Sequence, residues 1–357
     1  MKLIDRYILK KFLTTFFFCV LLLTLVIVII DFTEKIDKFN NAGVSNDEIL
    51  TYYASFIPFL AGLLTPITTF IAVVFITAKM AAQTEIIAIL SSGVSFRRLI
   101  VPYLMGALII GGMSFYLNGW VIPNANKYRI NFEVTYLDKP FYFNDTDIHF
   151  KVGDDLYAYI FRYNNRIDRG YKFTLEKFEG SKLKKKLTAN TISWDTVTNK
   201  WKLQSWQSRI FEGFNEIIEE GSAMDTTLNI LPLDFDNNSG LESALTIDEL
   251  NNHIALLQSR GADDVGLYQI EKYIRYMIPF TTLILTFIGL VVSARKSRGG
   301  TGFQIALGFL VAFLFIILFI FSKALAEKST GDPIYAIWSP NILFTFVGIL
   351  LYKSIPR

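Results

Sequence analysis

Cysteine and histidine are scarce in this sequence. Of its 357 residues one is a cysteine, Cys19, and two are histidines, His149 and His253. A single cysteine excludes a disulfide framework and a thiolate metal site, and two distant histidines leave little basis for histidine catalysis or zinc binding. The motifs G-x-x-x-x-G-K-[ST], H-E-x-x-H and G-x-S-x-G are missing from the sequence. We therefore expect no catalytic residue, no metal site, no cofactor and no P-loop for ATP.

Charge is missing from six long apolar runs. The runs are Phe12–Ile30, Ile49–Ala78, Leu99–Ile122, Tyr276–Ala294, Gly302–Ser322 and Pro333–Tyr352, and none contains Asp, Glu, Lys or Arg. A charge at the bilayer centre costs about 2.5–3.5 kcal/mol on insertion scales and is usually kept for function. The runs therefore argue against proton- or sodium-driven transport and against carboxylate hydrolysis inside the membrane. With 35 basic and 32 acidic residues the net charge is only +3, which does not suggest a nucleic-acid partner.

Apolar residues, by contrast, are abundant. They make up 52% of the chain, and the mean hydropathy is +0.37. A charge-free run of about 20 residues matches a membrane-spanning helix. We predict an α-helical polytopic membrane protein with six transmembrane helices and an antiparallel β domain inserted between helices 3 and 4. Residues 1–122 should hold helices 1–3, residues 123–270 the β domain, and residues 271–357 helices 4–6.

The short connecting segments predict the orientation. Lys and Arg gather at residues 2–11, 79–98, 295–298 and 353–357, whereas the connection Asp31–Glu48 carries five acids against two lysines. The positive-inside rule then puts both termini in the cytoplasm and residues 123–270 on the opposite side.

The inserted segment shows β patterning. Residues 156–163 and 171–176 alternate in side-chain type with a period of two, and turn signals recur between such runs. Short strands at this spacing predict an antiparallel sandwich or open barrel.

A short polar break, Lys79–Arg98, separates the second and third runs and predicts a small amphipathic helix. Thr84 is the expected N-cap, Glu85 lies in the first turn, and Gly93 is the expected stop. The apolar stripe consists of Ile86, Ile89 and Leu90. Such a helix on the cytoplasmic side can transmit a push from a soluble partner, or it can simply lie on the bilayer.

Several stretches together resemble the LptF/LptG permeases, which act with the ATPase LptB to extract lipopolysaccharide from the bacterial inner membrane. The resemblance covers nearly the whole chain and its three-plus-domain-plus-three layout. The start and the Tyr268-Gln269 region are closer to LptG than to LptF. The stretches that carry it are Ile4-Asp5-Arg6-Tyr7-Ile8, Pro66, Glu85 with Gly93, Trp120-Val121-Ile122-Pro123, Leu228 to Leu250, Tyr268-Gln269, Pro279 and Ser339-Pro340-Asn341.

The resemblance implies a set of partners and roles. Residues of about 80–93 would be the coupling helix that docks on an LptB-like ATPase dimer, which binds the ATP. Glu85, Ile86, Ile89, Leu90 and Gly93 would form that coupling site. A β-jellyroll domain would lie in the periplasm of a Gram-negative bacterium. The other implied partners are a second LptF/LptG-type permease, an LptC-like bitopic protein, a periplasmic LptA-like bridge and lipopolysaccharide itself.

Basic residues near the predicted periplasmic surface of the inner membrane are candidates for the lipid A phosphates. Lys38 matches the family's basic position better than Lys35 does, although acidic neighbours surround both. Lys323 could reach the same cavity or could be a snorkelling anchor. Lys127 and Arg129 are weaker candidates, since surface charges are the default reading.

Two other functions compete with lipopolysaccharide export. A mechanotransmission-type ABC subunit would flex its external domain to control a periplasmic partner, but such proteins commonly place that domain after the first span. A lipid-modifying membrane enzyme would need a carboxylate or histidine cluster, which the sequence does not show. Co-purification of an ATPase, a second permease and lipopolysaccharide distinguishes the three.

Overall fold

The computed structural model describes residues 3–137, 146–294, 300–328 and 331–353, apart from 154, 166, 197, 213–214, 229, 231, 236–239 and 261–264. The chain forms two compact units. Met1–Leu137, Leu241–Leu250 and Gly266–Arg357 form the first, here called the helical unit. Asp138–Gly240 and Asn251–Val265 form the second, here called the sheet unit. The segment Leu241–Leu250 therefore packs with the helices although it follows the sheet in sequence.

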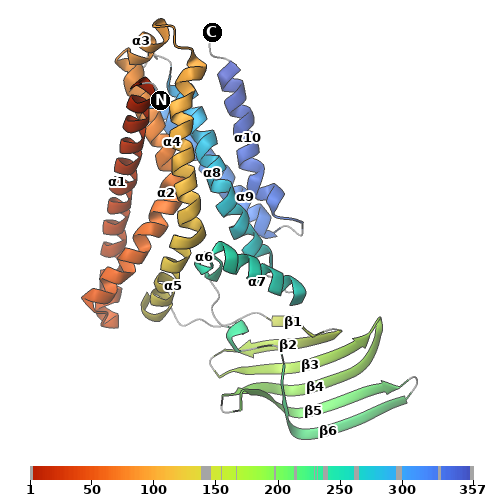
Figure 1. Cartoon of the computed structure of the whole chain (residues 1–357). Helices are drawn as coiled ribbons and strands as arrows, with labels where there is room; N and C mark the ends of the chain where they lie inside the picture. The colour runs from red at the N-terminus through yellow and green to blue at the C-terminus, as the bar shows by residue number, and fades with distance from the viewer. Residues whose placement is uncertain are drawn as a thin grey trace. The chain divides into compact units, whose positions relative to one another are not determined.

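Within the described residues, six helices are long and apolar enough to cross a membrane, which confirms the six predicted spans (Figure 1). Their bounds are α1 (Leu3–Ala42), α2 (Asn46–Ala82), α4 (Phe96–Tyr116), α8 (Val265–Ser293), α9 (Gly300–Lys328) and α10 (Ile334–Lys353). The third span continues from α4 through the π-helix η1 (Leu117–Val121), α5 (Ile122–Phe132) and the π-helix η2 (Glu133–Leu137). A seven-residue helix, α3 (Glu85–Ser91), joins α2 to α4.

The first span extends well beyond its apolar run. Asp31–Ala42, expected to be part of a loop, is the last part of α1. Asp31 and Lys35 form an ion pair one helical turn apart at 2.8 Å, and Phe39 is buried edge-on against Tyr52 of α2. Helix α2 then begins after Ser45, whose side chain forms a capping box with Glu48. These local bonds and the buried ring keep the polar segment helical.

Close approach and polar bonds hold the spans together. Gly106 of α4 lies directly against the ring of Phe12 on α1, so a larger side chain there would force the two helices apart. Thr281 of α8 donates a hydrogen bond to Asn341 of α10 at 2.9 Å. In lipid, where apolar contact alone favours no particular partner, small residues and interhelical hydrogen bonds specify the packing.

The sheet unit confirms the predicted antiparallel β domain. Its six strands pair in sequence order, so the described strands form one sheet rather than the two of a sandwich. They are β1 (Thr146–Gly153), β2 (Leu156–Asn164), β3 (Arg169–Glu179), β4 (Lys182–Asp195), β5 (Lys200–Glu212) and β6 (Asn215–Thr226).

One face of the sheet carries the core of this unit. Ala158, Ile160, Phe173, Ile192 and Leu203 are among its buried side chains. The segment after β6 returns to cover part of this core through the short 3₁₀-helix η3 (Pro232–Phe235), where Phe235 stacks on Tyr163 with ring centroids 3.8 Å apart.

Arg275 of α8 fastens the segment that leads from the sheet unit back to the spans. This segment contains α6 (Leu241–Ala244) and the start of α7 (Ile247–Arg260). The Arg275 side chain is 2% exposed and donates hydrogen bonds to the main-chain carbonyls of Glu242 and Leu245 at 3.0 and 2.6 Å. Its third partner is the Glu271 carboxylate at 2.8 Å. A buried guanidinium with three acceptors is satisfied and fixes the carbonyl end of α6.

Helix α7 begins with a capping box that sequence analysis did not identify. The main-chain N–H of Thr246 donates to the Glu249 carboxylate at 2.9 Å, and the N–H of Glu249 donates back to the Thr246 hydroxyl. Lys127 of α5 donates to the same carboxylate at 2.9 Å. The Thr246 N–H and then Lys127 hold the pKa of Glu249 below its usual value of 4.5.

Replacing Phe173 tests the sheet core. We expect Phe173→Ala to cost about 3–5 kcal/mol, because it opens a cavity in the middle strands. Thermal unfolding of the full-length protein in detergent measures this loss. The matched control is Tyr157→Ala, since Tyr157 on β2 is 43% exposed. Equal destabilisation by both substitutions would contradict the assignment of the core to one face.

The Glu249 box predicts a pH dependence. Because the pKa of Glu249 is depressed in the fold, its stabilisation is present above about pH 4.5 and is lost as pH falls through the folded pKa. We expect Glu249→Gln, which can keep the capping-box bond but loses the negative charge that faces Lys127, to cost about 0.2–1 kcal/mol at pH 7. The melting temperatures of the variant and the wild type should converge as pH falls below the folded pKa of Glu249. A difference that persists unchanged at low pH would contradict this.

Candidate functional site

The candidate coupling site is α3 with its flanking turns. Ile86 is 2% exposed and joins the cluster of buried side chains formed by α1, α2 and α4, and Ile89 packs against the same cluster. Leu90 points outward instead, as does Ile87, with 37% and 49% exposure. The predicted stripe is therefore divided: two of its members face the protein and the third faces outward.

The two ends of α3 differ from each other. Gly93 has a φ of 87°, the left-handed conformation expected of a glycine just past a helix end. Thr84 occupies the predicted N-cap position, but the prediction that its side chain caps the helix was wrong. Its φ is 57°, its hydroxyl donates to the carbonyl of Gln83, and it makes no cap bond to the helix. The first turn of α3 therefore depends on contacts with other elements.

Those contacts come from α1. The Glu85 carboxylate accepts a hydrogen bond from the Tyr7 hydroxyl at 3.1 Å and from the Lys11 ammonium at 3.3 Å. Lys11 also donates to the Tyr7 hydroxyl and lies over its ring. The sequence analysis did not connect these residues, although Tyr7 and Lys11 are four apart and so share one face of a helix.

The same end of the helical unit carries further basic side chains, some of them paired. Asp5 of α1 is buried and forms an ion pair with Arg98 at the start of α4. Arg97 donates to the hydroxyl of Tyr352 near the end of α10 at 3.3 Å. Figure 1 accordingly shows the N-terminus, α3 and the C-terminus at one end of the helices. Lys10 and Lys79, both exposed, add to this basic end.

Two of the predicted phosphate-binding residues lie in one buried network at the other end. Lys35 donates to the hydroxyl of Tyr52 at 2.8 Å, and that hydroxyl donates to Glu133 at 2.9 Å. Arg129 forms an ion pair with Glu133 at 3.0 Å, and Lys35 forms one with Asp31. The side chains of Lys35 and Arg129 are only 22% and 12% exposed. Their charges are thus compensated inside the helical unit.

The other three basic candidates are exposed and lie on separate elements. Lys127 pairs with Glu249, and Lys323 lies 3.9 Å from Glu327 one turn along α9. Lys38 is exposed and has no hydrogen-bond or ion-pair partner among the described residues. Of the five predicted cations, Lys38 therefore has the side chain most available to a ligand.

Two of the spans are nearly uncovered. Only 11% of the most apolar window of α1 and 22% of that of α9 is buried, against 28% for α10 and 50–56% for the spans α2, α4–η2 and α8. Phe17 and Phe313 are more than half exposed. An apolar hollow of about 290 Å³ opens between α2 and α9, with Val74 and Gly308 in its wall. These surfaces suit acyl chains or another apolar helix.

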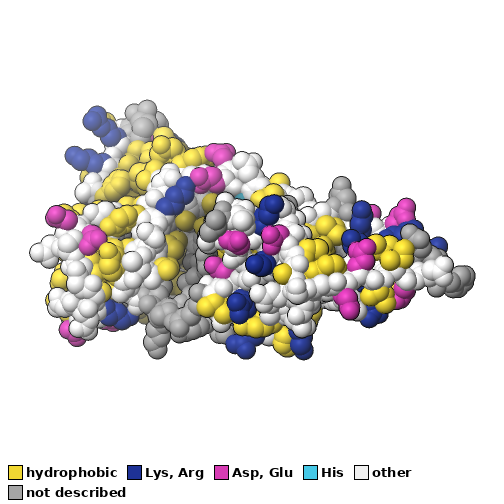
Figure 2. Space-filling view, turned by 90° about the horizontal axis from the view of Figure 1, so that it is seen from below, with side chains coloured by type: hydrophobic (Ala, Val, Ile, Leu, Met, Phe, Trp, Pro, Cys, Tyr) yellow, Lys and Arg dark blue, Asp and Glu magenta, His cyan; other side chains and the backbone are white. Residues whose placement is uncertain are grey.

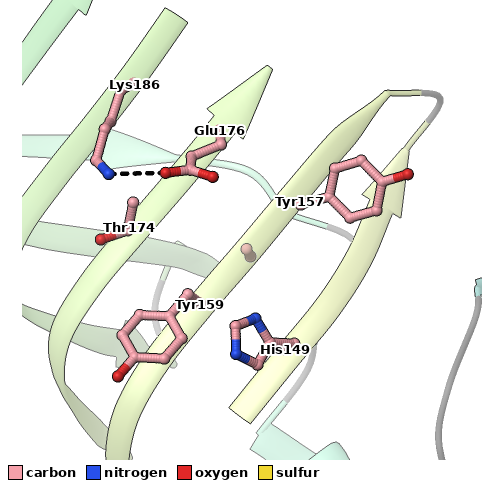
Figure 3. Close-up of a pocket in the computed structure, with 7 residues that line it drawn as sticks. His149, Tyr157, Tyr159, Thr174, Glu176 and Lys186 are labelled. Carbon is pink, nitrogen blue, oxygen red and sulfur yellow. Dashed lines mark hydrogen bonds and ion pairs between the residues drawn. The ribbon is translucent and has the colours of Figure 1, made fainter. Parts of the chain in front are cut away.

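A polar hollow of about 250 Å³ lies on the outward face of the sheet (Figure 3). Thr174 lies between the longer side chains of Tyr159, Glu176 and Lys186, and His149 packs beside Tyr159. Glu176 and Lys186 neutralise each other at 2.8 Å. This hollow can hydrogen-bond a small polar ligand, but its acid and base are already paired. In the described part of the chain no three metal-ligand side chains come together.

Tyr159, in the wall of this hollow, has a hydrogen-bond partner on the neighbouring strand. Its hydroxyl donates to Asp147 at 2.6 Å, and that bond raises the pKa of Tyr159 above its usual value. The phenol therefore stays protonated at neutral pH and acts as a donor. On the face seen in Figure 2, acidic and basic side chains are interspersed with hydrophobic ones, with no large patch of one sign. This distribution does not suit a nucleic-acid backbone.

Comparison with known families gives one match. The family described as lipopolysaccharide export system permease LptF/LptG matches residues 6–354. The matched range contains all six spans, α3 and the sheet. No curated protein matches the chain.

The buried network predicts a stability effect at Tyr52. We expect Tyr52→Phe to cost about 1 kcal/mol and to lower the melting temperature, because the hydroxyl serves both Lys35 and Glu133. The control is Tyr116→Phe, since Tyr116 on α4 is 60% exposed. An unchanged melting temperature for Tyr52→Phe would show that the network does not stabilise the fold.

Proposed function

The chain belongs to the LptF/LptG family of lipopolysaccharide export permeases, and from this we propose that it is one of two permease subunits of an ABC transporter. The transporter would extract lipopolysaccharide from the inner membrane and pass it to a periplasmic bridge. The observation that carries the proposal is the family match over residues 6–354 together with six spans and an inserted sheet. The matched family contains both LptF and LptG, and the match does not distinguish the two.

The energy would come from a separate LptB-like ATPase dimer. Helix α3 is the natural docking element, because Ile87 and Leu90 present apolar side chains outward between two membrane spans. Glu85, with 29% of its side chain exposed, adds a carboxylate at the edge of this surface. Such a contact would combine apolar burial with a charge-assisted hydrogen bond.

The basic end of the helical unit supports a cytoplasmic location for α3 and both termini. Exposed Arg6, Lys10, Lys79, Arg97 and Lys353 belong to the elements that meet there. Basic residues next to spans are retained on the cytoplasmic side. The sheet, inserted between the third and fourth spans, would then lie in the periplasm and hand the substrate to an LptA-like bridge.

The uncovered spans support a membrane partner. An LptF/LptG-type second permease could bury the exposed faces of α1 and α9, and an LptC-like single helix could insert beside them. The acyl chains of the substrate would occupy the apolar space enclosed between the two permeases. The hollow between α2 and α9 has the required apolar lining.

Lys38 is the first choice for the lipid A phosphates, because it is exposed and free of internal partners among the described residues. Lys323 and Lys127 are second choices, since each lies beside an acid that a phosphate would have to displace. Lys35 and Arg129 are better assigned to the structural network of Tyr52 and Glu133. The mechanotransmission alternative is disfavoured by the position of the sheet after the third span.

Purification and crosslinking test this proposal. The chain purified from its native membrane should carry a soluble ATPase, a second permease of similar length and bound lipopolysaccharide. A photo-crosslinker at Lys38 should capture lipopolysaccharide, and ATP should reduce the yield. A crosslinker at Lys35, which is internally paired, is the matched control and should capture less. Isolation without any ATPase, or transport by the chain alone, would refute the proposal.

A further inference from the structure

The coupling helix is bonded to the first span by charged and polar side chains. Tyr7 and Lys11 of α1 both reach the Glu85 carboxylate, at 3.1 and 3.3 Å, although they precede it by more than 70 residues. Neither Lys11 nor Glu85 is fully exposed, with 34% and 29% of their side-chain surfaces accessible. Partial burial of an ion pair with an added hydroxyl makes it stronger than an ordinary surface pair.

Apolar packing also joins α3 to α1, next to the bonds made by Glu85. Ile86, the residue after Glu85, is buried in one cluster with Ile8 and Phe12 of α1. The Asp5–Arg98 ion pair joins α1 to the start of α4 just beyond the other end of α3. The first turns of α1 are therefore bonded to the elements at both ends of the coupling helix.

Helix α3 has little means of holding its own orientation. It has seven residues, too few for a stable isolated helix, and Thr84 gives it no N-cap bond. Gly93 follows the helix in a left-handed conformation, which ends the helix. The side-chain bonds from α1 to Glu85 therefore help to orient its first turn.

The apolar stretch of α1 is mostly uncovered by the rest of this chain. Only 11% of its most apolar window is buried, compared with 56% for α2. This stretch is therefore less restrained by packing within the chain than α2 is. The bond to Glu85 lies at the start of α1, next to this stretch.

We propose that Glu85, Tyr7 and Lys11 form a link that transmits displacement of α3 to α1, with Glu85 acting as a positioning residue for the first span. The inference rests on the proposed function, since it needs an ATPase that pushes on α3. It adds a second role to the docking contact of Glu85, because the carboxylate also has partners in the same chain. The ATPase would contact the outward side chains Ile87 and Leu90 and the exposed edge of Glu85.

A charge exchange separates the two roles. In the full complex reconstituted into vesicles, Glu85→Lys and Lys11→Glu should each reduce ATP-driven lipopolysaccharide release by about tenfold or more while ATP hydrolysis continues. The double variant Lys11→Glu/Glu85→Lys restores opposite charges and should recover most of the release. If Glu85 instead served only to bind the ATPase, the double variant would be as defective as Glu85→Lys, which would overturn the link.

Two further variants distinguish loss of the link from a general folding defect. Tyr7→Phe retains the ring and removes one donor to Glu85, so it should reduce release by a few-fold at unchanged protein level. Lys10→Glu makes the same charge change on an exposed neighbour and should leave release unchanged. Normal release by Lys11→Glu would overturn the link. Failure of the wild-type complex to contain an ATPase or release lipopolysaccharide would instead refute the proposed function.

Discussion

The helical unit depends on the separation of charge from the bilayer interior. Its six apolar runs contain no acidic or basic residue, and the charged side chains gather at the two ends of the helices. At each end they form cross-helix bonds, Lys11 with Glu85 at one and Lys35 with Tyr52 at the other. A partly buried charge requires a partner, so these pairs determine which helix ends can lie together.

Between the two ends the spans are held by weaker and less directional contacts. Hydroxyl and amide side chains such as Thr281 and Asn341 bond across helices, and Gly106 lets α4 approach α1. A single interhelical hydrogen bond in a membrane contributes on the order of 0.6 kcal/mol. The ends of the bundle are therefore specified more strongly than its middle, which suits a protein whose middle must admit a lipid.

Much of the fold could be predicted from sequence, because bilayer thickness sets the length of a spanning helix and a half-buried strand has a period of two. The extension of α1 to Ala42 could not, since it depends on Phe39 finding Tyr52 in another helix. Glu85 and Ile86 were identified as special, but the partners of Glu85 were missed because no local pattern joins residues so distant. Residue type alone did not separate Lys38 from Lys35. The resemblance favoured Lys38, and the structure adds that Lys35 pairs with Asp31 on its own helix and with Tyr52 on another.

The polar hollow on the sheet is a second feature that depends on contacts between residues distant in sequence. Its lining comes from four strands, and only their pairing brings His149, Tyr159 and Thr174 into one row. Alternation predicted the strands that contain Tyr159 and Thr174, but no strand was predicted at His149. It did not predict which strands would be adjacent.

The unbroken length of α1 has a geometric consequence. Its 40 residues make a rod of about 60 Å, roughly twice the thickness of the hydrocarbon core. A tilt of about 5° around its midpoint would move each tip by about 2.6 Å in opposite directions. The rod would then act as a lever through the bilayer, with Tyr7 and Lys11 near one arm's tip and Lys38 near the other's.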